Sequence, residues 1–174
     1  MRNSFCVLTF LLLTACSSQH QSAKDIEYIE PLPIDAALLR IKNSSDYFIK
    51  LSIINDVPAC QQEIKLPGQS QLEEGKSLTL PVKGGQAFAV KVVSGYSNNI
   101  ITKRPACEVV AVFTPQVGQK YVLVYEGKPP IFCRFGMVKE IGEFEGKIMI
   151  EPEKSLRLYT YRARLSTRGR YCVD

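Results

Sequence analysis

Cysteine is the residue type with the widest range of chemistry in this chain of 174 residues. A thiol can act as a nucleophile, hold a metal ion, carry a lipid or form a disulfide. The six cysteines include no Cys-x-x-Cys pair, and the single histidine, His20, lies near the N-terminus. A Cys–His or Ser–His–Asp arrangement therefore cannot be built in the body of the chain, and only scattered thiolates are left for zinc. We expect the cysteines to serve attachment and structure.

Three carboxylates, at Glu140, Glu143 and Glu145, form the other group that could do chemistry. A pair of carboxyl groups can cleave a glycosidic bond, which would make the protein a glycan hydrolase. The same residues surround Gly142 and Gly146, however, a composition typical of a solvated turn between two strands. Since Gly-x-Ser-x-Gly, Ser-x-x-Lys and phosphate-binding glycine motifs are missing from the sequence, we expect a protein that is not an enzyme.

The first sixteen residues have the layout of an export signal. A basic residue, Arg2, precedes an apolar run over residues 5–13, which is too short for a permanent membrane anchor. The run closes with Leu-Thr-Ala-Cys at residues 13–16, which resembles the lipobox of bacterial lipoproteins. The resemblance implies that residues 1–15 are removed, that the Cys16 thiol receives a diacylglycerol and that its new amino group is acylated. The alternative is an ordinary secretory signal in which this cysteine is incidental.

The residues that follow Cys16 set the expected location and the tether. Ser17 stands where enterobacterial lipoproteins of the inner membrane have Asp, so the resemblance implies an outer-membrane lipoprotein with its domain facing the periplasm. Two or more acyl chains make the attachment stable, because each buried CH2 contributes about 0.8 kcal/mol. Residues 17–25 are polar and residues 26–36 contain prolines, so residues 16–36 are expected to form an extended tether. Apart from the acyl chains, we expect no cofactor.

The charge of the chain argues against a nucleic-acid partner. The net charge is +5, from 22 basic and 17 acidic residues, and it falls to about +4 when Arg2 leaves with the signal. A value in this range is ordinary for a soluble domain. Together with the expected location, it favours a membrane and protein environment.

The elements that must position these residues are expected to be short strands. Alternation of apolar and polar residues is typical of half-buried strands, and it places two sets of side chains on common faces: Tyr47, Ile49, Leu51 and Ile53, and Phe88, Val90 and Val92. Residues 107–114 and 120–126 are near-continuous runs of β-forming residues. Turn signals such as Pro67-Gly68 separate the segments. Residues 37–174 are therefore predicted to form one all-β domain, a small antiparallel β-sandwich.

One stretch, from Phe113 to Leu123, carries a family resemblance. Its sequence, Phe-Thr-Pro-Gln-Val-Gly-Gln-Lys-Tyr-Val-Leu, is similar to a hairpin of small bacterial envelope lipoproteins with PEGA-type or related sandwich domains. In those proteins one strand ends in Phe-x-Pro-x-x-Gly-x-x-Tyr, the next begins at the tyrosine, and a cysteine often follows on the third strand, as Cys133 does here. The resemblance covers residues 78–141 and implies a binding or structural module without catalytic residues.

Four cysteines lie beyond the signal, and an even number in an exported chain favours two disulfides. If residues 107–138 form a three-stranded meander, Cys107 and Cys133 lie at the same end of one sheet, about 9–10 Å apart. A disulfide needs Cα atoms within roughly 7 Å, so one of the two must lie in a curling loop. We favour this pair, which leaves Cys60 to bond with Cys172. The alternative, in which Cys60 bonds with Cys107 and Cys133 with Cys172, stays open.

The C-terminal stretch is rich in arginine and tyrosine. Arginine binds carboxylates and phosphates, and tyrosine provides flat contact area, so this stretch is a candidate surface for a partner. A strand whose outer face is charged for solubility is the alternative. The candidate residues are Arg157, Tyr159, Tyr161, Arg162, Arg164, Arg168 and Arg170.

Two functions fit these observations. In the first, the protein is a non-enzymatic accessory subunit or scaffold of a cell-envelope assembly, such as a secretion or surface-structure complex, because a tether raises its effective concentration near membrane-bound partners. In the second, it is a periplasmic binding module for peptidoglycan, lipopolysaccharide or an enzyme that it inhibits.

Overall fold

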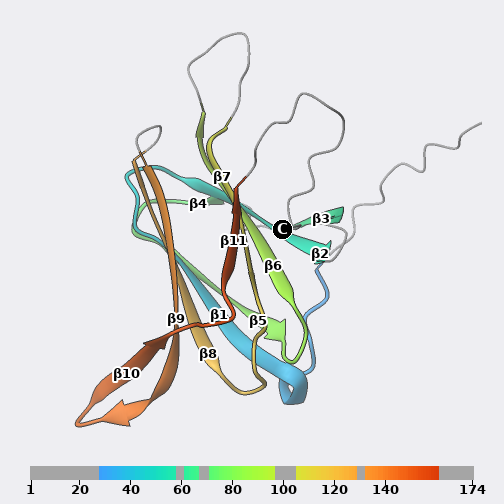
Figure 1. Ribbon diagram of the computed structural model, residues 1–174, viewed down its shortest axis with the longest axis vertical. Coiled ribbons are helices and arrows are strands. Elements are labelled where there is room, and N and C mark those ends of the chain that lie inside the picture. The colour runs from blue at the N-terminus through green and yellow to red at the C-terminus, as the bar shows by residue number, and fades with distance from the viewer. Residues whose placement is uncertain (1–27, 58–60, 67–70, 97–104, 129–131, 161–174) are drawn as a thin grey trace, which may run out of the picture.

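The computed structural model describes residues 28–57, 61–66, 71–96, 105–128 and 132–160, which form two β-sheets packed as a sandwich (Figure 1). The prediction of a small all-β sandwich is therefore confirmed. A short 3-10 helix, η1 (Pro33–Asp35), precedes the first strand. Within the described ranges, no helix is long and apolar enough to span a bilayer.

Sheet A has five strands in the order β10-β9-β8-β1-β5. They are β1 (Ala36–Asn43), β5 (Ser77–Lys83), β8 (Lys120–Lys128), β9 (Phe132–Phe144) and β10 (Lys147–Pro152). All neighbours run antiparallel except β1 and β8, which pair in parallel. The sequence could not reveal this pair, because side chains alternate in the same way whichever direction the neighbouring strand runs.

Sheet B has the strand order β11-β7-β6-β2-β3, and all its pairs are antiparallel. Its strands are β2 (Ile49–Asp56), β3 (Gln61–Lys65), β6 (Phe88–Tyr96), β7 (Pro105–Phe113) and β11 (Arg157–Thr160), and a two-residue strand, β4 (Gln71–Leu72), also pairs with β2.

The core lies between the sheets, and the predicted alternation accounts for most of it. The inward positions of β2 and β6 are buried as predicted; they are Ile49, Leu51, Ile53, Phe88, Val90 and Val92. Sheet A closes the core with long side chains, among them the fully buried Tyr121 and Tyr125 of β8. The Tyr125 hydroxyl forms a hydrogen bond with Ser94 of β6 and so links the two sheets.

Tyr47 is an exception to the predicted pattern, because β2 begins only at Ile49 and the Tyr47 side chain is exposed. The cause is a turn organised by Asn43, which is completely buried. The Asn43 amide nitrogen donates hydrogen bonds to the carbonyls of Tyr47 and Leu72 at 2.7 and 3.0 Å, and its oxygen accepts one from the Ser45 hydroxyl. These bonds hold the chain in a turn before the strand starts.

The predicted meander of residues 107–138 is wrong, because β7 lies in sheet B whereas β8 and β9 lie in sheet A. The segment from Phe113 to Tyr121, which resembles a hairpin, instead connects the two sheets. Its two aromatic rings contact each other edge to face at 5.2 Å between centroids, and the Tyr121 hydroxyl accepts a hydrogen bond from the Gln116 amide. A Phe-x-Pro-x-x-Gly-x-x-Tyr turn can therefore join strands of different sheets.

The predicted disulfide between Cys107 and Cys133 is present, with Cα atoms 6.1 Å apart. It joins β7 of sheet B to β9 of sheet A. The two cysteines therefore lie in different sheets and are not two strand spacings apart in one sheet. This bond excludes the alternative pairing of Cys60 with Cys107. Cys60 and Cys172 lie outside the described residues, and their bond stays a prediction.

Residues 28–35, which the sequence analysis assigned to the tether, lie against the domain. Tyr28 packs on the edge of the core, and its hydroxyl donates a hydrogen bond to the Pro81 carbonyl of β5. Burial, with a smaller contribution from the nearby Glu30 carboxylate, raises the pKa of Tyr28 to about 12. Any free tether therefore ends before Tyr28, not at residue 36 as predicted. Residues 1–27, with the signal and Cys16, lie outside the described residues.

Candidate functional site

The largest group of exposed apolar side chains among the described residues lies on the hairpin formed by the end of β9 and β10, although Ile29, Leu32 and Ile34 are individually more exposed. Strand β8 pairs with β9 only as far as Lys139, opposite Tyr121, so the hairpin continues beyond the neighbouring strand. It projects from the body of the sandwich (Figure 1). Glu145 and Gly146 form its tip with positive φ angles of 50° and 73°, as in a two-residue type I′ turn.

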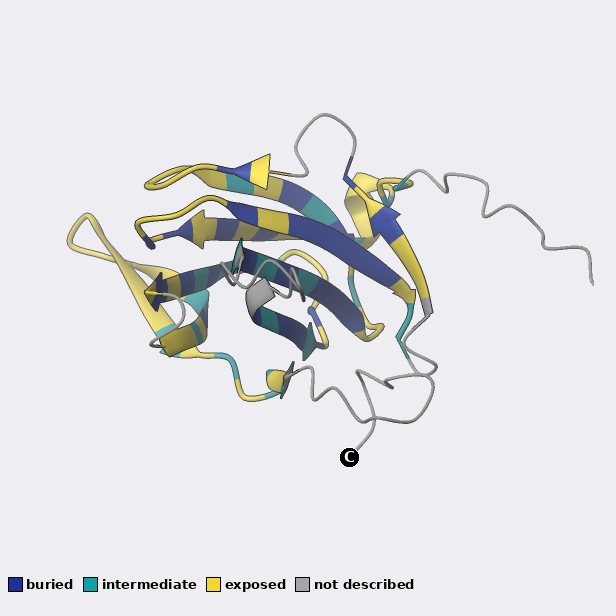
Figure 2. Cartoon of the chain, turned by 90° about the horizontal axis from the view of Figure 1, so that it is seen from above, coloured by how far each residue is buried: buried dark blue, intermediate teal, exposed yellow. Residues whose placement is uncertain are grey.

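Five large apolar side chains of this hairpin face solvent. Phe144 is 64% exposed, Ile148 60% and Ile150 57%. Ile141 and Met149 are about half-exposed. Figure 2 shows the projecting hairpin as one continuous exposed segment, in contrast to the mostly buried strands beside it. We call these five residues the hairpin apolar surface: Ile141, Phe144, Ile148, Met149 and Ile150.

The hairpin apolar surface has two faces, which follow from the strand register. Ile148 and Ile150 lie on the outer face of sheet A, in the row of Glu143 and Glu140. Phe144 and Met149 lie on the inner face, in line with the core. A strand with apolar residues on both faces is typical of a buried strand, yet here both faces are open.

An ion pair marks the point at which the core ends and the hairpin begins. Lys139 of β9 and Glu151 of β10 lie opposite each other on the inner face, with nitrogen and oxygen 2.7 Å apart. Their hydrogen bond raises the pKa of Lys139 and lowers that of Glu151. Past this pair, the inward side chains have no opposite sheet to cover them.

The three carboxylates that could form a hydrolytic site lie on this hairpin. Glu145 is exposed in the turn, as expected, whereas Glu143 is exposed but paired in β9 opposite Ile148, so the predicted turn is shorter than the three carboxylates suggested. Glu140 is half-buried and lies 4.0 Å from the Lys120 ammonium group. All three lie beside the hairpin apolar surface, together with the exposed Lys147.

The C-terminal candidate surface is only partly described. The exposed Arg157 donates hydrogen bonds to the carbonyls of Lys154 and Leu156, and so folds back on the turn before β11. Tyr159 packs on a small apolar cluster of the outer face of sheet B, formed by Ile54, Ala89 and Val110. The other candidate residues lie outside the described ranges: Tyr161, Arg162, Arg164, Arg168 and Arg170.

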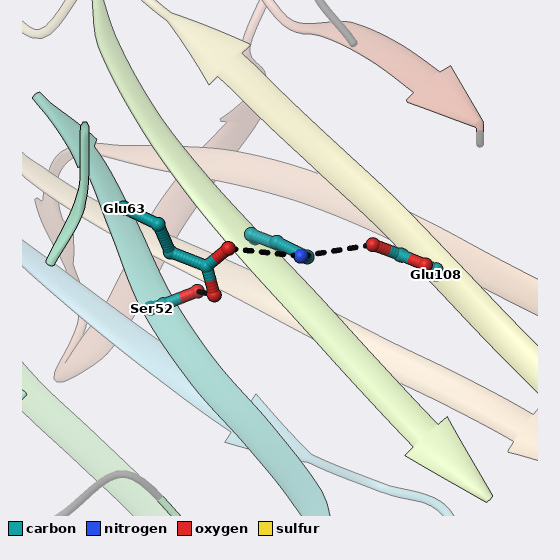
Figure 3. A network of polar contacts seen from close by, with 4 residues as sticks. Ser52, Glu63 and Glu108 are labelled. Atoms are coloured by element: carbon teal, nitrogen blue, oxygen red, sulfur yellow. Dashed lines mark hydrogen bonds and ion pairs between the residues drawn. The ribbon is translucent and has the colours of Figure 1, made fainter. Parts of the chain in front are cut away.

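A polar network crosses the outer face of sheet B, centred on Lys91 of β6. Its ammonium group contacts Glu63 of β3 at 3.0 Å and Glu108 of β7 at 2.9 Å, and Glu63 also accepts a hydrogen bond from Ser52 (Figure 3). The Lys91 side chain is only 13% exposed and that of Glu108 11%. The charges are satisfied within the sheet, so this network stabilises the pairing of four strands.

A shallow cavity of about 440 Å³ lies where residues 28–32 meet sheet B. Residues 53–55 and 86–88 line its other side, with Asp35 and Lys83. In the described part of the chain, every buried side-chain nitrogen and oxygen has a hydrogen-bond partner, and no group of three potential ligands could hold a metal ion. The cavity lining includes charged and amide side chains, among them Glu30, Asn55 and Lys83, but no buried polar atom of the described residues lacks a partner there.

Comparison of the chain with protein-family models, with curated proteins and with solved structures finds no match. The candidate site is therefore inferred from the residues of this chain alone.

Sequence reasoning missed the hairpin apolar surface, although a signal was present. In this part of the sequence, only the carboxylates around Gly142 and Gly146 were predicted as a candidate site. The three consecutive apolar residues 148–150 put apolar side chains on both faces of one strand. Next to a Glu-Gly turn signal, that pattern indicates either a strand buried on both faces or an exposed interface.

Proposed function

We propose that this protein is a lipid-anchored, non-enzymatic accessory subunit of a cell-envelope assembly, and that it docks on a protein partner through the hairpin apolar surface. The observation that carries the proposal is the exposure of Phe144, Ile148 and Ile150 on a projecting hairpin. Contiguous exposed apolar side chains with a polar rim mark interaction sites. The rim carries three acidic residues, Glu140, Glu143 and Glu145, and one exposed lysine, Lys147, and this acidic excess fits a partner whose own apolar patch has basic neighbours.

The lipid anchor is inferred from the sequence at residues 13–16. Because Tyr28 is packed on the domain, eleven residues, 17–27, separate it from Cys16. A chain of that length spans at most about 40 Å when fully extended. The anchor would therefore hold the hairpin within a thin layer beside the membrane, where a membrane-bound partner meets it at high effective concentration.

The alternative function, a binding module for peptidoglycan or lipopolysaccharide, depends on arginines that lie outside the described residues. Among the described residues of that stretch, Arg157 bonds to its own turn and Tyr159 packs inward. No described contact favours this alternative over docking by the hairpin.

The experiment is affinity capture of the full chain from gently solubilised membranes, followed by mass spectrometry of the captured chain and its companions. The test variant is Phe144→Ser with Ile148→Ser, and the control is Ile34→Ser, which changes an even more exposed apolar residue outside the hairpin. We expect a protein partner in comparable amount with the natural chain and the control, and its loss from the hairpin variant.

Three results would overturn the proposal. Retention of the same partner by the hairpin variant would show that docking occurs elsewhere. An intact mass without acyl chains on Cys16 would remove the lipid anchor. Recovery of glycan or lipopolysaccharide without a protein partner would move the alternative function ahead.

A further inference from the structure

The edge of β10 is a second feature of the hairpin, separate from its two apolar faces. β10 is the end strand of sheet A and pairs only with β9 among the described strands. Sheet edges are usually protected, because unpaired backbone groups attract another strand. Protection is weak here: the bulge of this hairpin, at Ile141, lies in β9, so the free edge of β10 stays regular.

The backbone geometry shows which groups of β10 are available. Phe144 and Lys147 flank the two-residue turn, and such a flanking pair exchanges backbone hydrogen bonds. The backbone groups of Lys147 and Met149 therefore point toward β9, and those of Ile148 and Ile150 point away from it. Pro152 ends the strand and limits any added pairing to residues 147–151.

Two copies of this five-residue strand have matching side chains when they lie side by side in opposite directions. The sequence Lys-Ile-Met-Ile-Glu has a positive charge at one end, a negative charge at the other and three apolar residues between. In an antiparallel pair of two copies centred on Met149, Lys147 of each copy lies opposite Glu151 of the other, whose carboxylate also binds Lys139 of its own chain. Ile148 then lies opposite Ile150 on the outer face, and the two Met149 side chains meet on the inner face.

We propose that two copies of this chain pair antiparallel along β10, with Met149 on the two-fold axis, and so join their A sheets into one. The proposal rests on the proposed function only in treating the hairpin as an interface. In this register Ile148 and Ile150 of the two copies exchange four backbone hydrogen bonds, because these are the residues whose backbone groups face outward. Each copy contributes the same surface, as an isologous dimer requires. The charge match at both ends selects this register over a slip by one residue, which would also turn every side chain to the wrong face.

The pairing leaves both faces of the hairpin accessible. The second copy covers the edge of β10, while Phe144, nearer the tip on β9, remains available to another protein. The dimer would therefore double the docking surface that the proposed function requires.

The test is disulfide trapping in the full chain in its membrane. Opposed residues at a non-hydrogen-bonded antiparallel pair have Cα atoms about 4.5 Å apart, within disulfide range. We expect Met149→Cys to give a covalent dimer after mild oxidation, and Ile148→Cys to give roughly fivefold less, since Ile148 lies opposite Ile150. The natural chain, with its own cysteines, and Ile34→Cys are the controls. Equal trapping at positions 148 and 149, or none above the controls, would overturn the proposal.

A charge exchange tests the register independently. Lys147→Glu or Glu151→Lys, each combined with Met149→Cys, places like charges at both ends of the pair and should lower trapping about tenfold. Coexpression of the two variants restores both attractive contacts, so we expect heterodimers to recover the natural yield. Failure of the mixture to recover would contradict this register. Loss of trapping while the partner is still captured would rule out the dimer and leave the proposed function. Trapping without capture of a partner would support the dimer and rule out the proposed docking.

Discussion

Cys107 on β7 and Cys133 on β9 join the two sheets of the sandwich through a disulfide, with their Cα atoms 6.1 Å apart. The bond lies at the start of β9, the strand whose far end carries the hairpin apolar surface. It also fixes β9 to sheet B, beside the hydrogen bond between Ser94 and Tyr125 that links the two sheets. The strand that carries the projecting hairpin is therefore held covalently at its opposite end.

Replacing both cysteines of this bond should destabilise the domain without changing the hairpin. For a sequence separation of 26 residues, the loss of the cross-link costs about 3 kcal/mol, which lowers the Tm by about 10 °C. Thermal unfolding of Cys107→Ser with Cys133→Ser, compared with the natural protein, measures this effect. An unchanged Tm would mean that the bond does not constrain the fold.

Gly127 of β8 should not tolerate a larger side chain. A Cβ atom at this position would overlap the hydroxyl of Tyr125, which is buried and bonded to Ser94. We expect Gly127→Ala to destabilise the domain by about 1–3 kcal/mol, measured by urea unfolding. Gly136→Ala is the matched control, because its Cβ would meet open space in the adjacent strand β9. Equal effects of the two changes would contradict this packing.

The network around Lys91 predicts how stability depends on pH. Burial raises the pKa of Glu63, but hydrogen bonds from Ser52 and Lys91 outweigh it and hold that pKa below its usual 4.5. Glu63 therefore stabilises the fold above about pH 4.5, and this contribution is lost as the pH falls through its lower native pKa. Burial lowers the pKa of Lys91, but its bonds to Glu108 and Glu63 outweigh that and raise it above 10.5, so its contribution is lost only in strong alkali.

Lys91→Met should therefore destabilise the domain by about 1–3 kcal/mol at pH 7, because it leaves the poorly exposed Glu108 without this cation. Its stability should also fall less between pH 6 and pH 3 than that of the natural protein. Urea unfolding across this range measures both effects, with Lys42→Met, at an exposed position of β1, as the control. If Lys91→Met lost as much stability between pH 6 and pH 3 as the natural protein, this would count against the network.

The alternation of apolar and polar residues predicted the individual strands of this protein better than it predicted their order in the two sheets. Ile49, Leu51 and Ile53 occupy the predicted face because a half-buried strand must alternate. The same pattern cannot show that the chain crosses from sheet B to sheet A between Phe113 and Tyr121, since a hairpin and a crossover need similar turn residues. The disulfide was predicted correctly from a wrong meander, because both arrangements bring Cys107 and Cys133 to one end of the domain.

The candidate site was harder to predict than the fold. Glu145 was correctly placed on a turn, but Glu140 and Glu143 lie in β9. The exposure of Phe144 and Ile148 depends on where β8 begins. The position at which β8 begins is a property of the neighbouring strand, and it cannot be read from the residues of β9 or β10. The arginines of the C-terminal stretch illustrate the opposite case, a strong local pattern whose surroundings lie outside the described residues.

The most direct test of the account is photo-crosslinking at position 144 in living cells. Phe144 replaced by p-benzoylphenylalanine should give a covalent adduct with a protein partner on illumination, because this side chain lies at the exposed end of the hairpin. The same replacement at Tyr47, which is also exposed but lies far from the hairpin, should give none. No adduct at position 144, or equal adducts at both positions, would contradict the claim that the hairpin is the docking surface.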